Sequence, residues 1–85
     1  MKTFTYTITD REGIHARPAG LLVKEAGKYK SQIMIEKAGK KVDLKRIFAL
    51  MSLAAKKDEQ VTVTCEGADE AEAATALEAF FKENL

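Results

Sequence analysis

The chain has 85 residues, a formal net charge of +1 and a composition that is 46% hydrophobic and 32% charged. These values exclude a disordered or fibrous chain. We expect one globular domain over residues 1–85, too small to enclose a deep active-site cavity. No apolar run is long enough for a signal peptide or a membrane span, so we expect a cytoplasmic protein. One Cys and one His supply neither an internal disulfide nor a zinc site, and we expect no metal and no cofactor.

The charges are divided unevenly along the chain. Residues 1–57 hold 13 Lys and Arg against 5 Asp and Glu, whereas residues 58–85 hold 1 against 8. The basic part would attract an acidic protein partner by long-range steering. We expect no nucleic-acid partner, because the exposed strand positions are rich in threonine and offer no aromatic platform on which bases could stack.

The first segments predict a strand followed by a helix. Residues 2–9 alternate apolar side chains with threonines, which is typical of a strand with one face in water. After a turn at residues 10–13, four apolar residues recur at helical spacing: Ala19, Leu22, Val23 and Ala26. Pro18 fits the first turn of this helix, which we expect to end near Gly27.

The middle of the chain predicts a hairpin and a second helix. A strand at residues 32–37 turns at residues 38–40 into a short strand at residues 41–43. Residues 44–57 are expected to form a helix, but its apolar residues cover more than one face: Leu44, Ile47, Phe48, Leu50, Met51 and Leu53. A helix on a small domain cannot bury all of these side chains, so some of them must face solvent.

The last third predicts a further strand and a third helix. Residues 60–66 alternate apolar and polar side chains, and Cys65 is among the inward ones, so we expect it to be a core thiol. Asp69 followed by Glu72 resembles a capping box at the start of the last helix. That helix should bury three residues: Ala74, Leu77 and Phe81.

The order of these elements is strand, helix, strand, strand, helix, strand, helix. Alternation in every strand predicts an α+β fold, in which one face of an antiparallel sheet is in water and all three helices pack on the other face. The first helix should be a right-handed crossover between the first two strands, with another strand between them.

The only histidine, His15, lies in the string from Gly13 to Ala19, where the first helix is expected to begin. A helix start offers unpaired backbone N–H groups and the positive end of the helix dipole, which together hold an anion attached to a side chain. A neutral imidazole is a nucleophile, and Arg17 adds a planar, always-charged donor fork. The backbone N–H groups of Ala16 and Arg17 could bind phosphoryl oxygens. The pattern therefore predicts a phosphoryl carrier.

The segment GIHARPA at residues 13–19 resembles the HPr family, the histidine-containing phosphocarriers of the bacterial phosphoenolpyruvate-dependent sugar phosphotransferase system. MSL at residues 51–53 and GADE at residues 67–70 support the resemblance, which covers the whole chain. It implies an open-faced β-sandwich with strand order 1-4-2-3. It also implies that His15 accepts a phosphoryl group on Nδ1 from phosphorylated Enzyme I and passes it to IIA domains of sugar permeases. We expect a monomeric carrier that is not a stand-alone enzyme.

The resemblance further places partner docking on an apolar surface beside His15. We expect six residues of the first two helices to form it: Gly20, Leu21, Lys24, Ile47, Phe48 and Met51. Gly20 would let a partner approach closely, and Met51 would adapt to several partners. The alternative is that the apolar residues pack in the core and that Lys24 is merely solvated.

One position departs from a common pattern of the family. Many HPr proteins of Gram-positive bacteria carry a serine, which an ATP-dependent HPr kinase phosphorylates, at the position occupied here by Arg46. Arg46 cannot accept that phosphate, so we expect this branch of regulation to be absent. The alternative function is a regulatory HPr paralogue that acts by protein binding. The presence of both His15 and Arg17 argues against it, because a pure binder needs no nucleophile.

Overall fold

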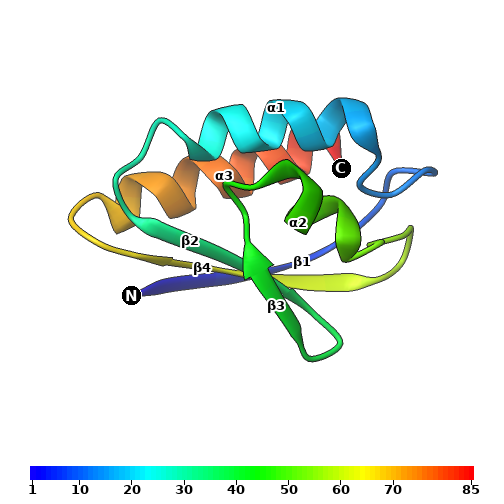
Figure 1. Ribbon diagram of the computed structural model, residues 1–85, viewed down its shortest axis with the longest axis horizontal. Helices are drawn as coiled ribbons and strands as arrows, with labels where there is room; N and C mark the ends of the chain where they lie inside the picture. The colour runs from blue at the N-terminus through cyan, green and yellow to red at the C-terminus, as the bar shows by residue number, and fades with distance from the viewer.

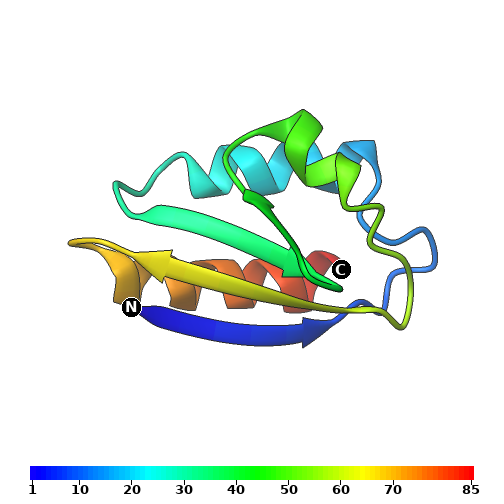
Figure 2. The same ribbon diagram turned by 60° about the horizontal axis from the view of Figure 1, so that its bottom comes forward.

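Four antiparallel strands form an open sheet with three helices on one face (Figure 1). The computed structural model describes residues 1–85. The strands are β1 Lys2–Thr7, β2 Gln32–Lys37, β3 Lys40–Asp43 and β4 Gln60–Glu66. The helices are α1 Ala16–Ala26, α2 Ile47–Ser52 and α3 Glu70–Asn84. The strand order β1-β4-β2-β3 confirms the predicted fold, and Figure 2 shows the face of the sheet that the helices leave uncovered.

The sheet buries the side of its strands that faces the helices. In its register, Phe4 of β1 and Ile35 of β2 both lie opposite Val63 of β4. The rings of Phe4 and Tyr6 contact Phe81 of α3 edge to face, with ring centroids 5.7 and 5.4 Å apart, a favourable aromatic geometry. The threonines of β1 are exposed on the other face, which confirms the predicted alternation.

Cys65 is fully buried on β4, as predicted. Burial is the main cause that raises the pKa of its thiol, and the carboxylates of Asp69 and Glu70 raise this pKa further. The thiol is therefore protonated at neutral pH and contributes to packing rather than to chemistry.

The first helix has the predicted end and most of the predicted buried face. Ala19, Leu22 and Ala26 are fully buried, whereas Val23 is only partly buried against the core. Gly27 follows as the C-cap residue. The strand before it ends at Thr7, two residues earlier than predicted. None of the three helices is both long enough and apolar enough to cross a lipid bilayer.

The second helix is much shorter than predicted. α2 begins at Ile47 and ends at Ser52. The residues before it belong to the sheet edge, and the residues after it leave the helical conformation. Leu44 extends the sheet pairing, since its N–H donates to the carbonyl of Ile33 (3.0 Å). After the helix, Ala54 has a φ of +51°, a value outside the α-helical range. The prediction of a helix over residues 44–57 was therefore wrong at both ends.

The buried stripe of α3 differs by one residue from the prediction. Ala73 is fully buried together with Leu77 and Phe81, whereas Ala74 is only partly buried at the edge of the core. The buried residues thus recur every four positions, and Ala73 rather than Ala74 faces the core.

The predicted capping box at the start of α3 is wrong. Asp69 occupies the N-cap position, but its side chain makes no capping hydrogen bond. Its carboxylate instead accepts hydrogen bonds from the Ser31 hydroxyl and from the N–H groups of Lys30 and Ser31. Glu72, the predicted partner of Asp69, is exposed. The Asp69 carboxylate therefore binds the segment before β2, whereas the local sequence pattern predicted that it would bind the N–H groups at the start of α3.

Candidate functional site

His15 occupies the N-cap position of α1, with an extended backbone (φ −95°, ψ −179°). Its carbonyl accepts the first hydrogen bond of the helix, from the Ala19 N–H (3.0 Å). Its side chain makes no capping hydrogen bond and is 36% exposed. The N–H groups of Ala16 and Arg17 therefore have no partner within the chain. The imidazole lies beside two free donors at the positive end of the helix dipole.

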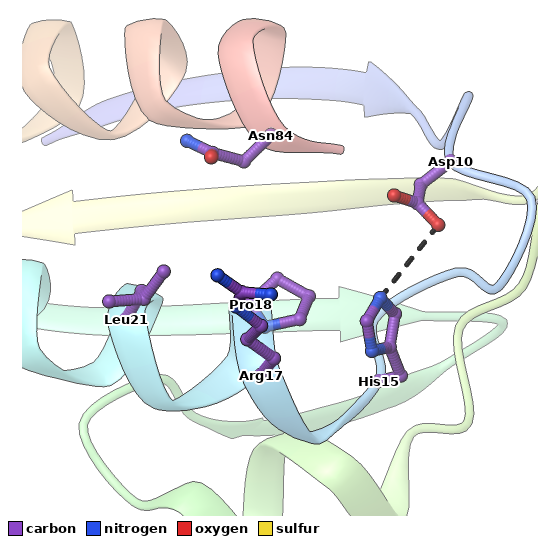
Figure 3. A pocket seen from close by; sticks show the side chains of 6 residues that line it. All are labelled: Asp10, His15, Arg17, Pro18, Leu21 and Asn84. Atoms are coloured by element: carbon purple, nitrogen blue, oxygen red, sulfur yellow. Dashed lines mark ion pairs between the residues drawn. The ribbon is translucent and has the colours of Figure 1, made fainter.

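Arg17 is exposed and forms no ion pair with the rest of the chain. Its side chain and that of His15 line an open hollow of about 240 Å³ (Figure 3). The other lining residues are Asp10, Pro18, Leu21 and Asn84. A phosphoryl group attached to His15 would have room there and an unpaired guanidinium close by.

A tight loop between β1 and α1 fixes the position of His15. Gly13 has a φ of +69°, and a Cβ atom at this residue would lie 2.2 Å from the carbonyl oxygen of Ala55. The same carbonyl accepts a hydrogen bond from the N–H of Ile14 (2.9 Å), whose side chain is buried. Only glycine satisfies both the backbone conformation and the lack of space. Ile14, the residue before His15, is thus anchored in the core, and the loop at Gly13 is held against Ala55.

Two carboxylates lie beside the Nε2 atom of His15. The Oε2 atom of Glu12 is 3.3 Å from Nε2 and the Oδ1 atom of Asp10 is 3.9 Å from it. Figure 3 shows the ring with this nitrogen toward Asp10. The same Oδ1 atom of Asp10 accepts a hydrogen bond from the Glu12 N–H (2.8 Å). No group of three His, Cys, Asp or Glu side chains in the chain, this one included, has an arrangement that could hold a metal ion.

Sequence reasoning treated Asp10 and Glu12 only as turn residues and missed their contact with His15. The signal that could have found them is the glycine at residue 13. A glycine between an acidic residue and a histidine three positions later lets the chain turn back, which brings the two side chains together.

The apolar residues predicted for docking lie on the adjacent helices α1 and α2 (Figure 1). Phe48 is 87% exposed, Leu21 49% and Met51 38%. Gly20 and Ile47 are half-buried, and the Cδ1 atom of Ile47 lies 3.9 Å from where a Cβ on Gly20 would be. We call these five residues the apolar surface. The large side chains of the apolar surface are exposed, except for Ile47, which also packs against the core.

Two cations lie on the same pair of helices. Lys24 is exposed in the last turn of α1, nine residues after His15, which is roughly 13 Å along the helix axis. It is therefore too far away to bind a phosphoryl group on His15. Arg46 is the N-cap residue of α2; its side chain is 79% exposed, and its Nε atom is 3.8 Å from the carboxylate of Asp43. Both cations are accessible to a partner.

The chain is similar to one protein family over almost its whole length. The family model described as "PTS HPr component phosphorylation site" matches residues 2–83. The structure of HPr from Thermoanaerobacter tengcongensis has a TM-score of 0.89 and 45% identity, and the match covers 100% of both chains. Phosphocarrier protein HPr from Bacillus anthracis has a TM-score of 0.88 and 40% identity, with 94% of this chain and 95% of that chain covered. Crh, the catabolite repression HPr of Bacillus subtilis, has a TM-score of 0.79 and 41% identity, with 94% and 92% covered.

Proposed function

The chain belongs to the PTS HPr family of phosphocarriers, and we propose that it carries a phosphoryl group on His15 between proteins of the sugar phosphotransferase system. Members of this family are not stand-alone enzymes. The observation that carries the proposal is the position of His15, whose half-exposed imidazole lies at the open start of α1 beside the unpaired guanidinium of Arg17.

The proposed transfer is a displacement at phosphorus. The lone pair of His15 Nδ1 forms a bond to phosphorus as the bond between phosphorus and the donor breaks, and its electron pair remains on the donor. The N–H groups of Ala16 and Arg17 and the guanidinium of Arg17 bind the phosphoryl oxygens and stabilise their charge. Transfer to the next protein reverses these steps.

An exposed site suits a carrier better than a buried one. A carrier must release its phosphoryl group as readily as it accepts it, so the phosphorylated form cannot be stabilised strongly. Charge interactions at an open surface are weakened by water and salt. The open hollow around His15 and Arg17 meets this requirement.

Phosphorylated Enzyme I and the IIA domains of sugar permeases are the proposed partners. Both would dock on the apolar surface and contact Lys24, because this is where large apolar side chains are uncovered next to His15. An acidic partner would also be attracted by the basic part of the chain. We propose that the carrier works as a monomer, since each transfer requires open access to α1 and α2. Crh of Bacillus subtilis crystallised as a dimer with a swapped domain; size-exclusion chromatography with light scattering tests whether this chain forms one.

The second candidate function is regulation by protein binding without phosphoryl transfer. The similarity to Crh, a protein named for catabolite repression, favours it. A protein that acts only by binding has no need of an accessible imidazole next to an unpaired guanidinium. We therefore rank the carrier first.

Incubation with phosphoenolpyruvate and Enzyme I, followed by intact-mass measurement, separates the two candidates. A carrier gains one acid-labile phosphoryl group, and the His15→Ala variant gains none. A native protein that stays unmodified while it still binds Enzyme I would support the regulatory alternative and contradict the carrier.

A further inference from the structure

The contact between His15 and the two carboxylates bears on which nitrogen of the ring reacts. Nε2 is 3.3 Å from Glu12 and 3.9 Å from Asp10, while no carboxylate is paired with Nδ1. We propose that Glu12 and Asp10 are positioning residues, which hold the proton of the neutral imidazole on Nε2 and so leave the lone pair on Nδ1. This inference rests on the proposed function of His15.

The chemical basis is the tautomerism of imidazole. A neutral ring carries one N–H group and one lone pair, and the charges and hydrogen-bond partners around each nitrogen decide which of the two it presents. A carboxylate accepts hydrogen bonds but donates none when it is ionised. The contacts of Nε2 with the two carboxylates do not have hydrogen-bond geometry, but two negative charges beside Nε2 still favour a proton on this nitrogen.

The loop that presents the carboxylates is braced by backbone hydrogen bonds. The N–H of Asp10 donates to the carbonyl of Leu85 (2.8 Å), and the carbonyl of Asp10 accepts from the N–H of Gly13 (3.0 Å). The N–H of Glu12 donates to the Asp10 carboxylate (2.8 Å). Asp10 thus positions Glu12 as well as contacting His15. The backbone that carries both carboxylates is therefore held in place.

The pairing also bears on the charge that develops during transfer. When Nδ1 forms its bond to phosphorus, Nε2 keeps its proton and the ring becomes positively charged. That charge faces Glu12 and Asp10, while Arg17 faces the phosphoryl oxygens from the hollow. On transfer to the acceptor, the electron pair of the N–P bond returns to Nδ1 and the ring is neutral again.

The carboxylates can be removed without unfolding the chain. The side chains of Glu12 and Asp10 are 68% and 31% exposed, and an exposed ion pair contributes little to stability. Glu12→Gln and Asp10→Asn keep the size of each side chain and remove its charge. Glu72→Gln is the matched control, because Glu72 is exposed in the first turn of α3. Figure 1 shows the start of α3 and the start of α1 at opposite ends of the molecule.

The test uses the fact that the chain has a single histidine. Histidine labelled with ¹⁵N then gives signals from His15 alone, and their shifts report the tautomer ratio at a pH of about 9, where an ordinary histidine is neutral. We expect Nε2–H to dominate in the native protein. In the double variant the ratio of Nε2–H to Nδ1–H should fall by about two- to fivefold, the size that an exposed charge pair supports.

A second readout is the rate at which phosphorylated Enzyme I transfers its phosphoryl group to each variant. This rate should fall by a similar factor in the double variant, with an unchanged urea midpoint, and stay unchanged in Glu72→Gln. An Nδ1–H tautomer in the native protein, or a ratio that the double variant leaves unchanged, overturns the inference. If the native protein accepts no phosphoryl group, the proposed function fails, but the tautomer ratio still decides the role of Glu12 and Asp10.

Discussion

The carboxylate of Asp69 and the hydroxyl of Ser31 are hydrogen-bonded to each other although 38 residues separate them in the chain. The Asp69 carboxylate also accepts hydrogen bonds from the N–H groups of Lys30 and Ser31 (2.8 and 2.9 Å). One side chain thus connects the start of α3 to the segment that enters β2. The hydrogen bond from the Ser31 side chain is the largest cause that lowers the pKa of Asp69.

We predict that Asp69 stabilises the fold at neutral pH and loses this effect in acid. The pKa of the folded-state carboxyl is below its ordinary value of 3.8, so the unfolded chain takes up a proton first as the pH falls. The stabilisation is complete above the ordinary value and disappears as the pH falls through the folded-state pKa. Urea unfolding of Asp69→Asn should therefore show a deficit in unfolding free energy at neutral pH that shrinks at a pH of about 3.

The exposed Glu72 provides the control for this measurement. Glu72→Gln should change the unfolding free energy little at either pH, because surface substitutions away from specific contacts have small effects. A deficit of Asp69→Asn that is equally large at both pH values would show that the charge of Asp69 is not the cause.

The close approach of Gly13 to Ala55 leads to a second prediction. Gly13→Ala would place a methyl group 2.2 Å from the Ala55 carbonyl oxygen and require an alanine at a φ of +69°. Gly39, with a φ of +85° and open space around it, is the matched control. We expect Gly39→Ala to lower the unfolding free energy by about 1–2 kcal/mol, the conformational cost alone. Gly13→Ala should lower it by more and also slow phosphoryl acceptance, because the loop that holds His15 must move. Equal losses in the two variants would contradict the steric argument.

The sequence predicted the fold well where the local pattern and the tertiary structure agree. Period-two alternation identified the strands because one face of the sheet is in water. The apolar residues Ala74, Leu77 and Phe81 identified α3, although Ala73 and not Ala74 is the fully buried one. The strand order came from the family resemblance, since alternation alone does not say which strands are neighbours. The second helix was overextended because Leu44 is apolar at a helical spacing yet belongs to the sheet edge. Ala54, two residues after the end of α2, has a positive φ that an alanine in the sequence does not predict.

The sequence predicted part of the candidate site, namely the location of His15 and Arg17, but not the contacts of His15 with Glu12 and Asp10. The start of α1 follows from residues near His15 in sequence, so its position and that of Arg17 could be expected. The contact of Glu12 with the imidazole depends on how Gly13 turns the chain against Ala55, which is a tertiary fact. The predicted capping box of α3 was wrong for the same reason. The Asp69 carboxylate accepts hydrogen bonds from Ser31, which is distant in sequence, and not from the start of its own helix.

Phe48 is predicted to contribute to docking and not to folding. Because its side chain is 87% exposed, Phe48→Ala should change the unfolding free energy by no more than about 0.5 kcal/mol. Loss of an aromatic anchor at an interface typically costs about 1–2 kcal/mol, so the KM of Enzyme I for the carrier should rise roughly five- to thirtyfold. Steady-state phosphoryl transfer with varied carrier concentration measures this.

Two variants control for the effects of removing an apolar side chain. Met34→Ala removes one from the uncovered face of the sheet and should leave the KM unchanged. Leu50→Ala removes a buried side chain of α2 and should lower the unfolding free energy by about 2–5 kcal/mol. A KM for Phe48→Ala equal to that of the native protein would remove Phe48 from the docking surface.

Arg46 should accelerate the encounter with an acidic partner. Its guanidinium is 79% exposed at the start of α2, and its contact with Asp43 is long, at 3.8 Å, so its charge is available to a partner. Reversing this charge in Arg46→Glu should lower the rate of transfer from Enzyme I at low salt by about three- to tenfold. The difference should shrink as salt rises, because the screening length falls from about 30 Å at 0.01 M to about 8 Å at 0.15 M. Lys2→Glu makes the same charge change on β1, at the opposite edge of the sheet from β3, and should slow transfer much less. Stopped-flow rates over a salt series decide the matter, and equal slowing by both variants would assign the effect to net charge rather than to the position of Arg46.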